Sequence, residues 1–416
     1  MAKAFVIGGG IAGLTAATAL AQRGAEVELF EAGPQAGGRC RSYFDPNLGL
    51  TIDNGNHLVL SGNHAVYAYL QRIGSVGALS GPDHAMVDFV DLPENLRWRV
   101  TLNDGLIPLW VLNRAARVPG TAVKDYAAYA PLLWAKKSAA IGETVKAQGM
   151  LWRRLVQPYL LAALNTQPEG ASAALAGSVL REGLMAGGRA CRPRIADPNL
   201  AAAFVTPALA FLESKGAKVN LGQRLRRFTI AGTGVRALEF ADATIPTGMK
   251  DAIVLAVNAP VAQDLVPGLT APNEFRAIVN AHFALAPPPD APPILGVVGG
   301  TAEWIFTFPD RISVTISAAD AIVEGERESL AARIWEDVTR ALQLNAPIPP
   351  WQIVKEKRAT FAATPEQDAL RPGPRTATRN LILAGDWTQT GLPATLEGAV
   401  RSGDVAARLA ARHLRL

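Results

Sequence analysis

The stretch Ala4-Phe-Val-Ile-Gly8-Gly-Gly10-Ile-Ala-Gly13 determines the fold, because it joins a short apolar run to a glycine motif. Residues 4–7 predict a buried strand that ends in glycines. Residues 11–23 carry small and apolar side chains at helical spacing, and Gly24 ends the predicted helix. Residues 27–31 predict a second strand, so the chain opens with a β-α-β unit.

The glycine motif G-x-G-x-x-G predicts a dinucleotide site. The first glycine permits the tight turn, the second lets the backbone approach a pyrophosphate, and the third permits close helix packing. The helix that follows offers free N–H groups and a partial positive charge to phosphates. Glu31 ends the second strand, where its carboxylate can accept hydrogen bonds from both ribose hydroxyls. The predicted contacts of this unit are Gly8, Gly10, Ile11, Ala12, Gly13, Glu31 and Ala32.

NAD would fit these residues equally well, and the later segments favour FAD. Gly38-Arg39 brings a guanidinium near the pyrophosphate or the flavin. Asp53-Asn-Gly55-Asn56-His57 contains a glycine that lets backbone pass close to a flat ring, although an Asn-Gly hairpin turn is an alternative. Residues 381–399 predict a buried strand, a turn with Asp386, and a helix whose N-terminus can face a flavin carbonyl. The alternative for that segment is an ordinary strand-turn-helix.

These later segments complete the predicted site. The predicted FAD contacts in them are Gly38, Arg39, Gly55, Asn56, His57, Leu225, Gly385, Asp386, Pro393, Ala394, Thr395 and Leu396. The two cysteines, Cys40 and Cys191, lie far apart and in no C-x-x-C pattern, so we expect neither a metal site nor a dithiol centre.

Length and composition limit the class of protein. A chain of 416 residues with 49% hydrophobic and 19% charged residues is typical of a globular protein with two domains. The net charge of +5 suits an anionic cofactor, an anionic membrane surface or a mildly basic soluble enzyme. Dispersed Lys and Arg argue against a nucleic-acid partner. With no signal peptide and no apolar run of spanning length, we expect a cytoplasmic chain at the inner face of the membrane.

The pattern along the chain predicts an α/β protein with a discontinuous Rossmann-type FAD-binding domain and a second, substrate-binding domain. We assign residues 1–80, 195–275 and 362–416 to the FAD-binding domain. Residues 81–194 and 276–361 form the predicted substrate domain, a mixed sheet with a helical cap rich in Trp, Leu and Pro. The prolines at 287–289 and 292–293 predict a rigid loop between two hairpin strands.

With these segments in place, the chain resembles the flavin amine oxidase and phytoene desaturase superfamily over nearly its full length. Within it, the chain is most similar to the bacterial hydroxysqualene dehydroxylases, also called squalene-associated FAD-dependent desaturases. The residues that carry the resemblance are Asp53–His57, Ala162–Thr166, Glu356–Phe361, and Ala384–Thr388 through Ser402-Gly403. The chain departs from the family at Asn56, commonly Gln, and at Leu392, commonly Trp; either change could alter the near face of the flavin.

The resemblance implies the reduction of hydroxysqualene to squalene, on a route towards hopanoids. This chemistry needs an acid for the leaving hydroxyl, a dry apolar pocket, and hydride from a reduced flavin. We expect His57 and Asp53 to supply the acid; alternatively, Asp53 caps a turn and His57 bonds only the flavin or backbone. Glu397 is expected to start a helix or to pack. The other histidines, His64, His84, His282 and His413, belong to no recognisable constellation, and we expect them at the surface or in structural positions.

Other functions and contacts stay open. A carotenoid-type desaturase would use the same fold in the oxidative direction, and a non-catalytic FAD-containing membrane scaffold of an isoprenoid pathway is a second alternative. The reductant is expected to be an external electron donor, and neighbouring squalene-pathway enzymes are expected partners. Residues 106–117 and 151–155 combine apolar side chains with arginines, which predicts peripheral membrane contact through Trp110 and its neighbours. Internal cap helices would show the same pattern.

Overall fold

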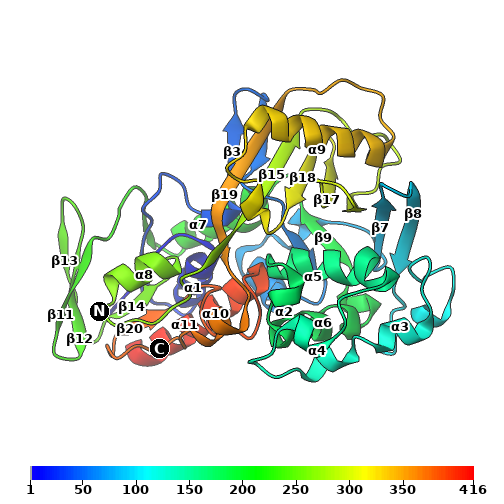
Figure 1. Cartoon of the computed structure of the whole chain (residues 1–416). Helices are drawn as coiled ribbons and strands as arrows, with labels where there is room; N and C mark the ends of the chain where they lie inside the picture. The colour runs from blue at the N-terminus through cyan, green and yellow to red at the C-terminus, as the bar shows by residue number, and fades with distance from the viewer. Residues whose placement is uncertain (1) are drawn as a thin grey trace.

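The computed structural model describes residues 2–416; residue 1, the first of the predicted segment 1–80, lies outside them. Two sheets organise the molecule (Figure 1). The first is parallel, and its strands in spatial order are β10 (Lys218–Asn220), β2 (Glu26–Phe30), β1 (Lys3–Ile7), β14 (Ala252–Leu255) and β20 (Leu381–Leu383). Its strands come from three separated parts of the chain. This confirms the discontinuous Rossmann-type architecture.

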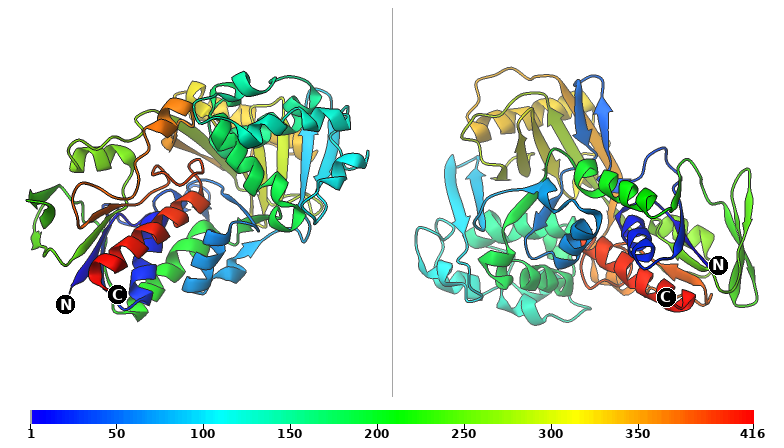
Figure 2. Two further views of the ribbon diagram at one scale, coloured as in Figure 1. Left: turned by 90° about the horizontal axis from the view of Figure 1, so that it is seen from below. Right: turned by 180° about the vertical axis from the view of Figure 1, so that it is seen from behind.

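Helices and a small sheet cover the two faces of the parallel sheet. One face packs against α1 (Ile11–Gln22), α7 (Thr206–Ser214) and α11 (Leu396–Leu414), which bury alanines and leucines against β1 and β14. Figure 2 shows α11 lying alongside α1. The other face packs against α8 (Ala259–Leu265) and a three-stranded antiparallel sheet. The strands of that sheet are β11 (Arg227–Ala231), β12 (Gly234–Glu239) and β13 (Thr244–Pro246).

The second large sheet has seven strands and is mixed. Its strands in spatial order are β19 (Trp351–Phe361), β15 (Phe275–Phe283), β18 (Arg311–Ile316), β17 (Trp304–Phe308), β16 (Ile294–Val298), β7 (Met86–Asp91) and β8 (Leu96–Thr101). Only the β16–β7 pair is parallel among these neighbours. Alternate residues of β15, such as Val279 and Ala281, pack on α9 (Arg327–Leu342). The intervening residues, Asn280 and His282, therefore face the opposite side.

One expectation about this sheet is wrong. The proline-rich loop at residues 287–293 connects β15 to β16, but these strands are not a hairpin, because β18 and β17 lie between them in the sheet. The loop must therefore cross the end of two strands, a path that local sequence pattern does not specify.

The helical cap lies below the seven-stranded sheet in Figure 1, on the side opposite α9. Its helices are α3 (Val123–Ala127), α4 (Ile141–Thr144), α5 (Gln157–Leu164) and α6 (Ala173–Glu182). Trp110 and Trp152 lie in the same apolar core as Phe89 and Trp98 of the sheet, so cap and sheet share one interior. The domain boundaries that we assigned along the chain stay a prediction.

Short elements connect these parts. They are the β3–β4 hairpin (Ser42–Asp45 and Leu50–Asp53), β5 (Leu58–Leu60), β6 (Leu79–Ser80), β9 (Pro193–Ala196), α2 (His64–Ile73) and α10 (Pro365–Ala369). β9 pairs with both β5 and β6. Within residues 2–416, no helix combines the length and apolar character needed to cross a membrane.

Candidate functional site

The glycine turn after β1 leaves space for an anionic group. Gly8 has φ +107° and an added Cβ would lie 2.4 Å from the Ala256 carbonyl oxygen, while a Cβ on Gly13 would lie 1.9 Å from the Gly8 oxygen. A Cβ on Gly10, by contrast, would meet nothing within 4 Å. The N-terminus of α1 has no side-chain cap and no acidic residue in its first turn. The turn therefore fits a pyrophosphate, which would approach the backbone on the open side of Gly10.

Glu31 lies beside this turn and is fixed by two backbone N–H groups. Its Oε2 accepts a hydrogen bond from Gly9 N at 2.6 Å, and its Oε1 accepts one from Gly33 N at 2.7 Å. Each carboxylate oxygen keeps a further lone pair, because an ionised carboxylate has about four acceptor sites. Glu31 thus has a fixed orientation and spare capacity for ribose hydroxyls.

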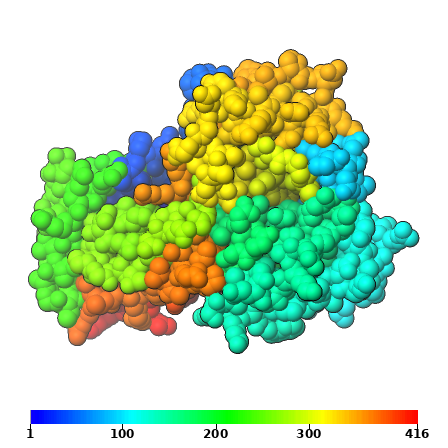
Figure 3. Space-filling model, in the orientation of Figure 1, coloured from blue at the N-terminus to red at the C-terminus, as the bar shows by residue number. Residues whose placement is uncertain are grey.

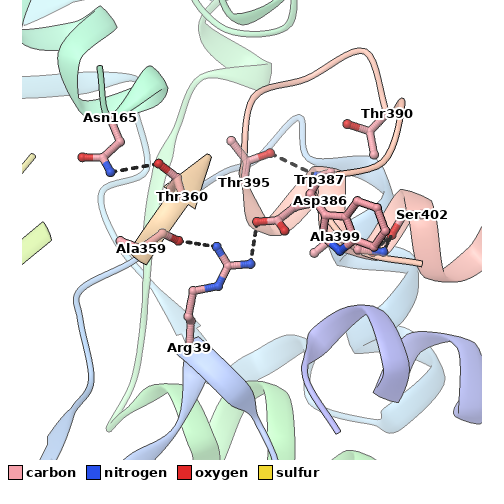
Figure 4. A network of polar contacts seen from close by, with 12 residues as sticks. Arg39, Asn165, Ala359, Thr360, Asp386, Trp387, Thr390, Thr395, Ala399 and Ser402 are labelled. Carbon is pink, nitrogen blue, oxygen red and sulfur yellow. Dashed lines mark hydrogen bonds and ion pairs between the residues drawn. The ribbon is translucent and has the colours of Figure 1, made fainter. Parts of the chain in front are cut away.

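Arg39 connects the two large sheets. Its Nη2 lies 2.6 Å from Asp386 Oδ2, and its Nη1 donates to the Ala359 carbonyl oxygen of β19 at 2.5 Å (Figure 4). The negative charge of Asp386 raises the pKa of Arg39, so the guanidinium stays charged. The neighbouring Thr360 accepts a hydrogen bond at its Oγ1 from Asn165 Nδ2. Asn165 is the residue at the C-terminal end of cap helix α5. Predicted flavin-binding residues and the cap therefore meet at the end of β19.

The loop that carries Asp386 is held by a residue that the sequence did not single out. Arg371 is fully buried and donates to the carbonyl oxygens of Asp386 at 3.1 Å and of Thr388 at 3.0 Å, and to Thr390 Oγ1 at 2.8 Å. Burial lowers the pKa of Arg371, and Asp368 opposes this effect. No motif surrounds Arg371, so only its burial in the structure reveals this role.

The helix after Asp386 begins as predicted. Thr395 is the N-cap of α11 and accepts a hydrogen bond from Gly398 N. The Glu397 carboxylate accepts hydrogen bonds from Ala65 N and Val66 N at the start of α2. Glu397 is thus a packing partner that caps a second helix, as expected.

The segment from Asp53 to His57 is not a hairpin turn. β4 ends at Asp53 and pairs with β3, whereas β5 begins at Leu58 and pairs with β9, so the Asn-Gly hairpin alternative is wrong. Asp53 Oδ1 accepts hydrogen bonds from Ser42 Oγ at 2.5 Å and from Leu200 N at 2.9 Å. Burial raises the pKa of Asp53, which favours the protonated carboxyl.

Asp53 and His57, the residues predicted to supply the acid, line one small cavity. With Asn56 they line a cavity of about 10 Å³, together with Phe306 and Phe308 of β17. Burial, and next the charge of Arg39, lower the pKa of His57 to about 4. His57 is therefore a neutral imidazole at pH 7.

His282 lies in a buried polar constellation that the sequence did not reveal. It is fully buried on β15, and its Nδ1 lies 2.8 Å from Ser313 Oγ of β18. The nearby Arg311 has a nitrogen 3.7 Å from Asp53 Oδ2 and stacks on Phe308. Burial lowers the pKa of His282 to about 3, so this histidine is also neutral. Strand periodicity could have shown which face it lies on, but not its partners.

The remaining predicted contacts have less specific surroundings. Leu225 is buried in the apolar core near β11. Gly385 has φ +143° and its N–H is bonded to Ser402 Oγ of α11. Their contacts with a flavin stay predictions.

The two segments predicted at a membrane differ from one another. In residues 151–155, Trp152 and Arg154 are buried, and Arg153 and Arg154 pair with Asp91. This segment is an internal cap helix, and its prediction as a membrane contact is wrong. Trp110 is also buried, edge-on to Tyr126, so it is not an interfacial anchor. Its neighbours are exposed by 55% to 72%; they are Leu106, Ile107, Leu109 and Leu112.

Comparison with known proteins identifies the family. Residues 11–411 match the family model of flavin containing amine oxidoreductases. The chain is 56% identical to the hydroxysqualene dehydroxylase of Rhodopseudomonas palustris and 53% identical to that of Sinorhizobium fredii, with 97% of this chain and of each relative covered. A probable zeta-carotene desaturase of Synechococcus elongatus is only 21% identical over 97% of both chains. A putrescine oxidase double mutant has the same fold, with a TM-score of 0.73 at 16% identity over 99% of both chains.

The structural match agrees with the fold of the chain, a parallel sheet joined to a second, mixed sheet. The chain therefore belongs to the flavin containing amine oxidoreductases, within them to the family of the hydroxysqualene dehydroxylases, and is a flavin-dependent oxidoreductase.

Proposed function

We propose that the protein is an FAD-dependent enzyme that reduces hydroxysqualene to squalene in the biosynthesis of squalene and hopanoids. The observation that carries this proposal is the high identity to relatives named hydroxysqualene dehydroxylase along nearly the whole chain. The meeting of Arg39 and Asp386 with the end of β19, next to cap residue Asn165, supports a flavin placed against the cap.

Glu31 supports FAD as the flavin. FMN lacks the adenosine ribose that a carboxylate at the end of β2 would bind. The fixed Glu31 carboxylate and the open face of Gly10 provide one site for a ribose and one for a pyrophosphate. Arg39 supplies a charged guanidinium for the same cofactor.

The proposed reaction removes one oxygen from an allylic carbon. The hydroxyl takes up a proton and leaves as water, and the carbon gains a hydrogen together with two electrons. A reduced flavin supplies that hydride when it is bound. The protein must then deliver the proton, exclude bulk water and hold the polyene.

We propose that His57 and Asp53 deliver the proton. They share the small cavity with Phe306 and Phe308, whose rings form part of its apolar wall. The raised pKa of Asp53 favours a carboxyl that retains its proton. The lowered pKa of His57 makes its imidazolium rare but strongly acidic.

The cap is the proposed site of the long apolar substrate. Its core is continuous with the inner face of the seven-stranded sheet and contains Trp98, Trp110, Trp152 and many leucines. The hydrocarbon chain of a polyene has no polar groups, so it can pack against these apolar side chains without a hydrogen-bond partner. The proposed electron donor is external to this chain, and neighbouring squalene-pathway enzymes are proposed to hand over the substrate.

We further propose peripheral contact with the inner face of the cytoplasmic membrane through residues 106–112. Four apolar side chains are exposed there, and Arg114 and Arg117 follow them in the sequence. Exposed apolar side chains next to arginines suit an interface with anionic lipid. In Figure 3 the cap forms the lower right lobe, away from the lobe of the parallel sheet.

The direct test is anaerobic incubation of the photoreduced protein with hydroxysqualene, followed by extraction of the product. We expect squalene and reoxidation of the flavin, and no squalene from the protein left oxidised. The oxidised protein should be incubated with squalene and phytoene in parallel. Desaturated products in that arm, without squalene in the first, would replace our proposal by the carotenoid-type desaturase. If hydroxysqualene does not reoxidise the reduced flavin, and squalene and phytoene do not reduce the oxidised flavin, the non-catalytic scaffold is favoured.

A further inference from the structure

We propose that Asn56 recognises the substrate hydroxyl by accepting a hydrogen bond from it, and that Thr315 and Asn280 fix the orientation of the Asn56 amide for this purpose. The inference rests on the proposed function. It assigns to Asn56 a contact with the substrate in addition to, or in place of, the cofactor contact predicted from the sequence.

A chain of hydrogen bonds determines which end of the Asn56 amide is free. The Asn54 carbonyl oxygen can only accept, so Asn280 must present its Nδ2 to it, at 3.3 Å. The Asn280 Oδ1 then faces Thr315, whose hydroxyl donates to it at 2.8 Å. Because the Thr315 proton is used in this way, its oxygen accepts from Asn56 Nδ2 at 3.0 Å. The backbone carbonyl thus sets the polarity of the whole chain, and Asn56 Oδ1 is left over.

The Asn56 Oδ1 atom is buried and has no hydrogen-bond partner within residues 2–416. A buried acceptor without a donor is unfavourable, so a ligand that brings an O–H group relieves this cost. Asn56 lines the cavity of about 10 Å³, which is about the space that one oxygen atom needs.

The surroundings of this oxygen match an alcohol on an apolar chain. Asp53 and His57 line the same cavity, and Phe306 and Phe308 form its apolar wall. A hydroxyl that donates its proton to Asn56 Oδ1 keeps its lone pairs for a proton from His57 or Asp53. Asn56 would therefore distinguish hydroxysqualene from squalene, and it would hold the oxygen where the acid can protonate it.

The test compares the affinities of the oxidised holoenzyme for hydroxysqualene and squalene, measured by perturbation of the flavin absorbance. Oxidised flavin cannot reduce the substrate, so binding is measured without turnover. We expect Asn56→Leu to lower the preference for hydroxysqualene about 10- to 100-fold and to leave squalene affinity unchanged. Thr315→Val should act in the same direction, because the Asn56 amide loses the partner that orients it. Thr315→Ser keeps the hydroxyl and should restore the preference.

Thr307→Val is the matched control, since Thr307 lies on the adjacent β17 and its hydroxyl donates to Pro292 O, outside the Asn56 hydrogen-bond chain. An unchanged preference in both Asn56→Leu and Thr315→Val would overturn the inference. Loss of flavin from Asn56→Leu, with an unchanged preference in Thr315→Val, would assign the acceptor to the cofactor instead and would also overturn it. Squalene formation by the reduced parent protein is measured separately: if the parent makes squalene, these outcomes reject the inference alone. A parent that neither binds nor converts hydroxysqualene rejects the proposed function and the inference together.

Discussion

The Arg39 guanidinium and the Asp386 carboxylate lie 2.6 Å apart, although 347 positions separate them in the chain. Arg39 also donates to the Ala359 carbonyl oxygen. This one side chain therefore joins three segments: the one that follows β2, the strand β19, and the loop before α11. These are the segments that we expect to surround the flavin.

This contact predicts an energetic coupling in flavin binding. Arg39→Ala and Asp386→Asn should each weaken flavin binding, and the double variant should weaken it by less than the sum. Because Arg39 is partly exposed, we expect a coupling of only about 1 kcal/mol. Flavin titration of the four apoproteins measures the cycle. Strict additivity would show that the ion pair does not organise the site.

The open face of Gly10 predicts a selective loss of the cofactor. Gly10→Val should yield folded, colourless protein, because its Cβ meets no atom of the protein but would occupy the approach to a pyrophosphate. Circular dichroism should match the parent while flavin absorbance is lost. Gly77→Val, at another glycine with no neighbour near its Cβ, should stay yellow. Full flavin content in Gly10→Val would remove this turn from the site.

The proposed acid predicts a specific pH dependence. His57→Ala or Asp53→Asn should lower turnover about 10²–10⁴-fold. With a His57 pKa of about 4, the imidazolium fraction falls about tenfold per pH unit from pH 5 to 8. If imidazolium is the acid, the rate falls likewise, with no inflection near 6.5.

Two comparisons test this assignment of the acid. Ser42→Ala removes one hydrogen bond to Asp53 and keeps its carboxyl, so it should retain most of the turnover. A bell-shaped profile with an inflection near 6.5 that persists in His57→Ala would place the acid elsewhere.

Glu303 predicts a pH-dependent stability. Burial raises its pKa to about 7, and the hydrogen bond from Ser317 N opposes this effect. Between about pH 4.5 and 7 the folded state therefore binds more protons than the unfolded state, and stability falls as pH rises. Glu303→Gln should lose this decline while keeping an acceptor for Ser317. Thermal unfolding at pH 5 and pH 8 measures it; an identical decline in parent and variant would contradict the assignment.

The exposed apolar segment predicts salt-sensitive binding to anionic liposomes. Ile107→Glu with Leu112→Glu should abolish flotation of the protein with the liposomes, because both side chains are more than 60% exposed. Ile230→Glu, at an exposed apolar residue of β11, is the control and should float like the parent. If the parent does not float, the substrate must be delivered by another protein.

Several features could be predicted from local sequence because their causes are local. The G-x-G-x-x-G turn, the strand before Asp386 and the cap at Thr395 depend on residues a few positions apart. A positive φ at Gly8 and a side-chain oxygen at a helix start are constraints within one turn of chain. The family resemblance rests on the combination of these motifs along nearly the whole chain, and it identified the family correctly.

The order of strands and the polar partners could not be predicted in this way. The proline-rich loop looked like a hairpin connection, but two other strands lie between β15 and β16. Trp110 and Trp152 occur in patterns that suit an internal helix and an interfacial helix equally, and packing buried both. Apolar periodicity identifies a face of an element, whereas the tertiary structure determines what covers that face.

The sequence by itself predicted a dinucleotide site at the first turn and determined that the chain belongs to a flavin family, since backbone geometry and short motifs carry that information. Only the tertiary structure showed that Arg371 donates to the Asp386 loop and that Thr315 accepts a hydrogen bond from Asn56, 259 positions away. Such hydrogen-bond partners are selected by the tertiary packing of segments, and a buried polar group must find its partner among the groups that this packing brings near.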